Sequence, residues 1–291
     1  MTRIDTKTLA RSALLGLFLT VDGLGLQSLK SRFILHIGPP PLAQLAGCAA
    51  CYLAAGFLFA LAFFLLSDRL PGRTWIGKGL RYAVLIYVAV WISGFFNLGA
   101  IDFDGGWRLL SPAKVEALWM AAADGLNFMI AGFLLGLVAG RAGPPVSVRL
   151  PWSSNLALRA ASGALLLPVL CAGLSYLVSF LLPYGLDLSG ARARLFYVFL
   201  FVPLSIAGAG TARLHDVLRS APPSRGCGAE SLRVCLAIFL LYWVANAAFV
   251  LFLGFTWQVL VDFLLSLAVS LFLTIVVLES AARVRWTAVT A

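Results

Sequence analysis

Three aspartates lie well inside long apolar stretches of this sequence, away from their ends, where a carboxylate is costly to keep. They are Asp22, Asp124 and Asp262. A charged side chain at the centre of a bilayer costs about 2.5–3.5 kcal/mol even on permissive insertion scales, so such residues usually face protein or water. Acids in these positions can bind a cation, carry a proton or hold a polar head group. We therefore start from these three residues.

Helical spacing predicts that two of the acids face other helices. Apart from Phe128, small or polar residues follow each acid at steps of four, a pattern typical of closely packed helices in membranes. The ridges are Asp124, Phe128, Gly132, Gly136, Gly140 and Asp262, Ser266, Ser270, Thr274. Asn127 extends the polar face beside Asp124. We expect Asp124, Asp262, Asn127 and Asp22 to bind a substrate or an ion, and the alternative is that each acid locks its helix to a neighbour.

Other chemistry finds little support in the sequence. Cys48 and Cys51 form a CxxC pair without a nearby histidine or a second cysteine pair, so we expect ordinary packing and no metal site. Neither histidine, His36 nor His215, lies inside an apolar stretch, which argues against a haem held by two histidines. No GxSxG, HExxH or GxxxxGK[ST] motif is present. The sequence predicts no cofactor and favours a protein that is not an enzyme.

Composition identifies the medium in which these residues work. Of 291 residues, 61% are hydrophobic and 12% are charged, whereas soluble domains have roughly 45–50% and 25%. The net charge of +10 comes from Lys and Arg in short connections between apolar runs, so it does not indicate nucleic-acid binding. The fold class expected is all-α, a polytopic bundle of transmembrane helices that contacts membrane lipids.

Eight apolar runs are long enough to cross about 30 Å of hydrocarbon, the first only marginally. They are Ser12–Leu29, Leu45–Leu66, Tyr82–Phe103, Ala113–Gly140, Leu156–Leu182, Leu195–Leu214, Val234–Leu253 and Trp257–Leu278. Ser111 and Pro112 form a typical helix start before the fourth run. Pro168, Pro203, Gly208 and Gly210 lie inside runs and predict interruptions of the helices there.

The basic residues predict the orientation of the eight spans. Sixteen of the 22 Lys and Arg residues fall on the side that carries both termini, and the other six, Lys30 among them, fall on the opposite side. The positive-inside rule then places both termini in the cytoplasm and the chain in the plasma (inner) membrane. Arg81 and Arg233 begin helices on the cytoplasmic side, where we expect contact with lipid head groups.

An internal repeat is indicated by residues that recur with the same spacing and in the same order. The pairs are Leu80-Arg81 and Trp91 with Leu232-Arg233 and Trp243, and Trp119 and Asp124 with Trp257 and Asp262. They predict two membrane halves of four helices each, residues 1–145 and 146–291. Because four is even, the halves share one orientation, as in parallel transporter repeats.

These patterns favour a transporter or flippase for a small polar or lipid-linked substrate, with paired intramembrane aspartates. Two alternatives remain open. One is a membrane enzyme acting on a lipid-linked substrate, with Asp22, Asp124 and the loop acids Asp102 and Asp104 near one groove. The other is a non-catalytic subunit or assembly factor, for which membrane protein partners or a second copy of the chain are expected.

Overall fold

The described part of the protein is almost entirely helical. A computed structural model describes residues 6–33, 42–91, 112–140, 157–169, 204–214 and 217, and apart from the connection at 67–74 the described segments are helices. Three stretches are long and apolar enough to cross a membrane, namely Thr6–Lys30, Leu45–Leu66 and Leu118–Gly140. The prediction of a helical protein rich in candidate transmembrane helices is therefore confirmed for this part of the chain.

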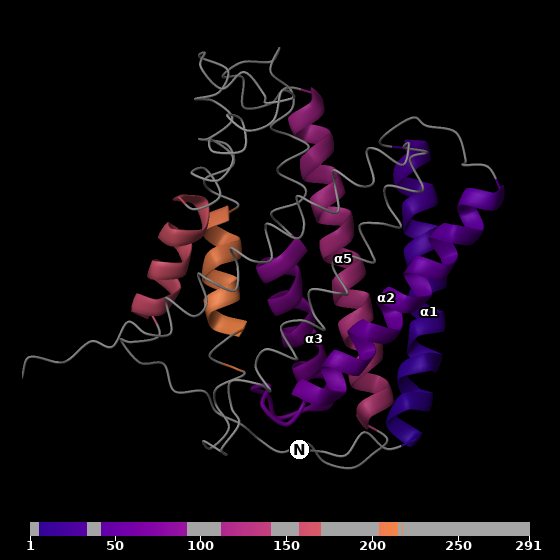
Figure 1. Ribbon diagram of the computed structural model, residues 1–291, viewed down its shortest axis with the longest axis horizontal. Coiled ribbons are helices and arrows are strands. Elements are labelled where there is room, and N and C mark those ends of the chain that lie inside the picture. Colours follow the sequence, from indigo (N-terminus) through magenta and orange to yellow (C-terminus); the bar gives the residue numbers. More distant parts are fainter. Residues whose placement is uncertain are drawn as a thin grey trace, which may run out of the picture. The chain divides into compact units, whose positions relative to one another are not determined.

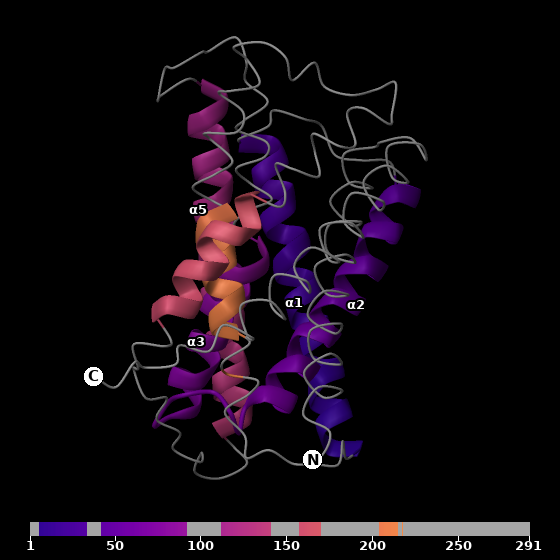
Figure 2. The same cartoon turned by 60° about the vertical axis from the view of Figure 1, so that its left-hand side comes forward.

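Helices α1 (Thr6–Phe33) and α2 (Leu42–Leu66) lie side by side in both views (Figures 1 and 2). Their backbones come close where Gly16 faces Gly56. A Cβ atom added to Gly16 would lie 2.8 Å from the amide nitrogen of Phe57, and one added to Gly56 would lie 2.8 Å from the Gly16 carbonyl oxygen. Any larger residue would push the helices apart, which is how small residues let membrane helices approach.

The connection after α2 is held by a buried lysine. Lys78, near the start of α3 (Trp75–Ile86), is 0% exposed and donates a hydrogen bond of 2.5 Å to the carbonyl oxygen of Ser67. Its ammonium also lies 5.7 Å from the centre of the Trp75 ring. A cation is well placed there, because the carbonyl groups at the end of a helix carry partial negative charge. Burial lowers the pKa of Lys78, and nearby Asp68 opposes that shift.

Gly72 makes the turn in this connection possible. Its φ is 154°, in a region that residues with a side chain rarely adopt, and an added Cβ would lie 2.9 Å from Cγ of Lys78. The tight connection therefore depends on glycine both for its backbone and for room beside the buried lysine.

Aromatic residues join α2, α3 and α5 (Pro112–Gly140) in one core. The Tyr82 ring lies 4.8 Å from Phe59 and 5.5 Å from Phe63, and its hydroxyl donates to the Phe59 carbonyl oxygen at 2.9 Å. Phe128 of α5 meets Phe59 edge-on at 5.6 Å. Edge-to-face and tilted ring pairs are favourable arrangements, so this cluster fixes the three helices against one another.

The glycine ridge of α5 packs against α3, as its spacing predicted. An added Cβ on Gly132 would lie 2.5 Å from the Gly79 carbonyl oxygen, and one on Gly136 would lie 2.5 Å from Cα of Ile76. These helices touch through their backbones, so α5 presents one fixed face to its neighbours.

The chain divides into two compact units. One contains residues 1–86, 122–150 and 217–268, and the other contains residues 87–121, 151–216 and 269–291. The described parts of the first unit are α1, α2, α3, the connection at 67–74, the α5 residues from 122 onward and residue 217. The second unit includes the π-helix η1 (Tyr87–Trp91), the start of α5 and the helices at 157–169 and 204–214.

In the second unit, the predicted interruptions at Gly208 and Gly210 do not occur. The helix at 204–214 runs through both glycines, and the helix Ala157–Val169 includes Pro168. Gly208 instead touches the backbone of Gly163, and an added Cβ on Gly210 would lie 2.8 Å from a side-chain carbon of Val88 in η1. These glycines allow neighbouring helices to pack closely. The residue type alone does not show whether a glycine has this role or interrupts a helix.

Candidate functional site

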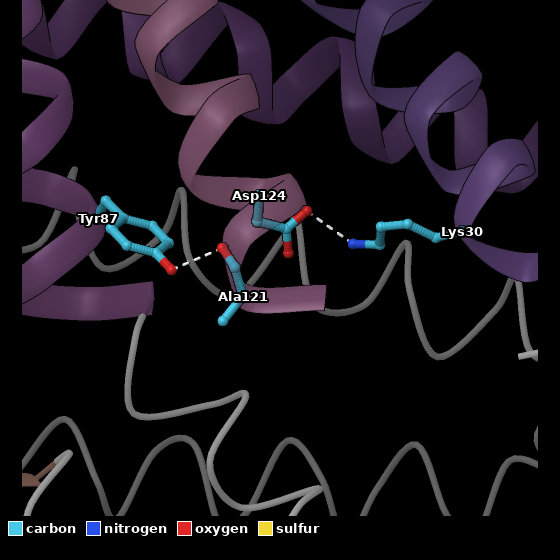
Figure 3. Close-up of polar contacts among 4 residues, drawn as sticks. All are labelled: Lys30, Tyr87, Ala121 and Asp124. Carbon is cyan, nitrogen blue, oxygen red and sulfur yellow. Dashed lines mark hydrogen bonds and ion pairs between the residues drawn. The ribbon is translucent and has the colours of Figure 1, made fainter. Parts of the chain in front are cut away.

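Asp124 forms a buried ion pair with Lys30 (Figure 3). The Lys30 Nζ atom donates to Asp124 Oδ1 at 2.6 Å, and the two side chains are 4% and 7% exposed. The pair links the last turn of α1 to the middle of α5, residues 94 positions apart in sequence. Both residues lie within candidate membrane spans, so a full charge pair is enclosed among apolar helices.

The packing face of α1 brings Lys30 to this position. Gly16, Gly23 and Lys30 follow one another at steps of seven, which is close to two helical turns, so they share one face. Gly16 contacts the backbone of α2, and an added Cβ on Gly23 would lie 3.0 Å from the ring of Tyr52. Lys30 therefore emerges from the face of α1 that packs inside the protein.

The glycine ridge fixes the direction of Asp124. Asp124 lies one turn before Phe128 and two turns before Gly132, both of which contact neighbouring helices. Trp119, five residues earlier on the same helix, is 65% exposed and belongs to a different face. Asp124 as a whole residue is consequently 5% exposed, on the side of α5 that packs against protein.

Burial makes each ion of this pair depend on its partner. Taking either ion out of water costs several kcal/mol, and the attraction between close opposite charges compensates only while both partners are present. Lys30 is also in the last turn of α1, where the helix dipole favours a cation. The arrangement can hold a positive group against a carboxylate in an environment of low dielectric constant, where such an interaction is strong.

Two further predicted residues have buried oxygen atoms without a hydrogen-bond partner. These are Oδ2 of Asp22 on α1 and Oδ1 of Asn127 on α5. Asn127 lies one turn from Asp124, and Asp22 lies about two turns before Lys30. Buried polar atoms normally have a partner, so these unpartnered acceptors, on the same two helices as the ion pair, indicate capacity to receive hydrogen bonds from a bound group.

Helix α2 packs against the same face of α1 that carries Lys30. Its half-buried Tyr52 has its ring beside Gly23 of α1. Cys48 is buried and Cys51 is partly buried. Within the described residues there is no group of three or more His, Cys, Asp or Glu side chains that could hold a metal ion.

The remaining predicted residues fall elsewhere. Arg81 is exposed on α3, so its side chain is accessible at the surface. Asp262 and Arg233 lie outside the described residues, as does most of the second predicted half. The pairing of Asp124 with Asp262 and the lipid contact of the arginines therefore stay predictions.

Sequence reasoning missed Lys30 as a partner of Asp124 and counted it among the charges of a connection. The structure places it inside α1, which continues to Phe33, with its ammonium buried. The step of seven from Gly16 through Gly23 is the signal that could have identified its buried position.

No protein-family model, curated protein or solved structure matches this chain. The function is therefore argued from the residues of the site.

Proposed function

We propose that this protein is a transporter or flippase of the plasma (inner) membrane, with Asp124 as part of its substrate or ion site. In this proposal eight helices span the bilayer as two parallel halves of four, residues 1–145 and 146–291, with both termini in the cytoplasm. Asp262 supplies the second acid of the site. Rocking of one half against the other would expose the acids alternately to the two sides.

The observation that carries this proposal is the buried Lys30–Asp124 ion pair. An ion pair is costly among apolar helices, and hydrophobic residues of similar size usually give equal or greater stability. Ionisable residues within membrane helices more often mark paths for ions, protons or substrates. The unpartnered oxygens of Asp22 and Asn127 add acceptors close to the pair in sequence.

The contact itself also favours a second role, in which the ion pair only holds α1 against α5. A non-catalytic membrane subunit would need such fixed contacts and no site. The two functions predict different results when the acids are neutralised: the loss of a structural lock changes stability alone, whereas the loss of a transport site changes flux in protein that is still folded.

Reconstitution into vesicles tests this. The purified protein is placed in liposomes containing a trapped pH-sensitive dye, and proton movement is recorded on addition of amino acids, amines, organic acids or nucleosides. Flipping is followed with fluorescent phospholipid analogues and an impermeant quencher. We expect the wild-type protein to exceed protein-free vesicles in one of the assays, and Asp124→Asn with Asp262→Asn to abolish that activity.

The matched control is Asp68→Asn, which removes an exposed acid just after α2. It should leave the rate unchanged. A wild-type protein without activity in any of these assays, or a folded double variant at the full rate, would refute the proposed function.

A further inference from the structure

The group that pairs with the Asp124 carboxylate is the side chain of Lys30, a primary ammonium on an unbranched alkyl chain. Lys30 reaches the carboxylate through four methylene groups, and its side chain is 4% exposed along this path. The first unit thus encloses both the charged head and the apolar stem of the lysine. A proton or a bare metal ion would need no such space for a stem.

The acceptor groups on the two helices that form the ion pair suit a donor with several N–H bonds. An ammonium has three donors and no acceptor, whereas Asp124, Asp22 and Asn127 all present oxygen atoms that accept. The Oδ1 atom of Asn127 and the Oδ2 atom of Asp22 are buried without a partner. Tyr52 adds a half-buried aromatic side chain from α2, whose ring lies beside Gly23 of α1.

We propose that Asp124 is the centre of a binding site for primary ammonium groups, and that Lys30 is its built-in occupant in this conformation. The inference deepens the proposed function by naming the class of substrate, and to that extent rests on it. A ligand of this class carries its ammonium on a short alkyl stem and replaces Lys30 at the carboxylate. Free alkylamines have this chemistry, and so has the ethanolamine head group of a phospholipid.

Chemical rescue of a lysine-truncated variant tests the site directly. Lys30→Ala removes the outer three carbons and the nitrogen, which together have the shape of propylammonium. We expect this variant to melt roughly 5–10 °C below the wild type in detergent, because Asp124 loses its buried partner. Added propylammonium should recover a large part of that loss.

Four comparisons isolate the chemistry. Propanol has the stem without charge, and tetramethylammonium has the charge without N–H donors, so neither should stabilise Lys30→Ala. Lys30→Met fills the space of the stem and should not respond to propylammonium. In Lys30→Ala with Asp124→Asn the carboxylate is gone, and the response should disappear.

Nanodiscs separate the two sources of the ammonium. Phosphatidylethanolamine carries a primary ammonium, whereas phosphatidylcholine carries a quaternary one without N–H donors. A higher melting temperature of Lys30→Ala in phosphatidylethanolamine identifies the lipid head group as a ligand. Rescue by propylammonium without this lipid difference identifies a free amine, and either result supports the site.

The proposal is overturned if Lys30→Ala responds to neither form of primary ammonium, or if the response persists after Asp124→Asn. If Lys30→Ala aggregates, the readout becomes the yield of monodisperse protein purified with or without propylammonium, and equal yields overturn the proposal. Rescue without any vesicle activity would refute transport and leave the ammonium site in place. Vesicle activity without rescue would refute the ammonium site and leave the proposed transport function in place.

Discussion

Replacing Lys30 by methionine should reveal how strongly the buried ion pair stabilises the helices. The substitution keeps the length of the side chain and removes its charge, so Asp124 stays buried without a counter-ion. At 2.6 Å and an effective dielectric constant of about 20, Coulomb's law gives roughly 6 kcal/mol of attraction. Desolvation of both ions offsets much of this, but losing one partner of a buried pair typically costs about 3–5 kcal/mol.

A double-mutant cycle provides the assay. The free energy of unfolding is measured for wild type, Lys30→Met, Asp124→Asn and the double variant, by adding denaturing detergent to mild micelles and following the helical circular dichroism signal. We expect Lys30→Met to lose about 3–5 kcal/mol. Asp124→Asn should lose less, because Lys30 lies three residues from the end of α1 and can extend toward the head groups. The double variant should be more stable than Lys30→Met.

The alternative is an ordinary polar contact between helices. Hydrogen bonds between membrane helices average about 0.6 kcal/mol in double-mutant cycles. A loss below about 1 kcal/mol for Lys30→Met, with effects of the two substitutions that simply add, would refute the view that the pair is a desolvated ion pair.

Two further predictions concern other contacts. Gly136→Ala should lower the unfolding free energy by about 1–3 kcal/mol, because its Cβ would lie 2.5 Å from Cα of Ile76. Gly140→Ala, whose Cβ would have its nearest neighbours in Trp75 at 3.9 Å, should change that free energy by less than about 0.5 kcal/mol. Equal effects of the two variants would contradict backbone contact between α3 and α5. Burial lowers the pKa of Lys78 in the folded protein, so the unfolded chain binds more protons and stability should rise as the pH increases toward the ordinary value of 10.5. In unfolding measured from about pH 8 upward, Lys78→Met should lack this rise, and a variant that keeps it would show that another group is responsible.

Much of the described fold could be predicted because it depends on local pattern. The run Leu45–Leu66 is the same in the sequence prediction and among the candidate spans, since length and apolar content define it. Pro112 begins α5 as its position after Ser111 predicted. The glycines after Asp124 face a neighbouring helix, because steps of four repeat along one side of any α-helix.

Only the tertiary structure shows which residues contact the glycines and the charged side chains. Gly208 and Gly210 were predicted to interrupt a helix but lie within a continuous one. The sequence cannot separate a glycine that breaks a helix from one that lets two helices touch, because the residue is the same in both cases. The sequence placed Lys30 and Lys78 in connections between apolar runs, yet both side chains are buried. Lys30 contacts Asp124 of α5, and Lys78 contacts the Ser67 carbonyl oxygen just after α2. Position in the sequence sets which face of a helix a residue occupies, but not which helix covers that face.

The sequence by itself determined that this protein is helical, apolar and marked by acids inside its apolar runs. It placed Asp124 on a packing face, since that depends on residues within a few turns. The partner of Asp124 lies 94 residues away on α1, and the packing of the helices brings the two charged groups to 2.6 Å. Such a contact depends on how whole helices pack, which no local spacing contains.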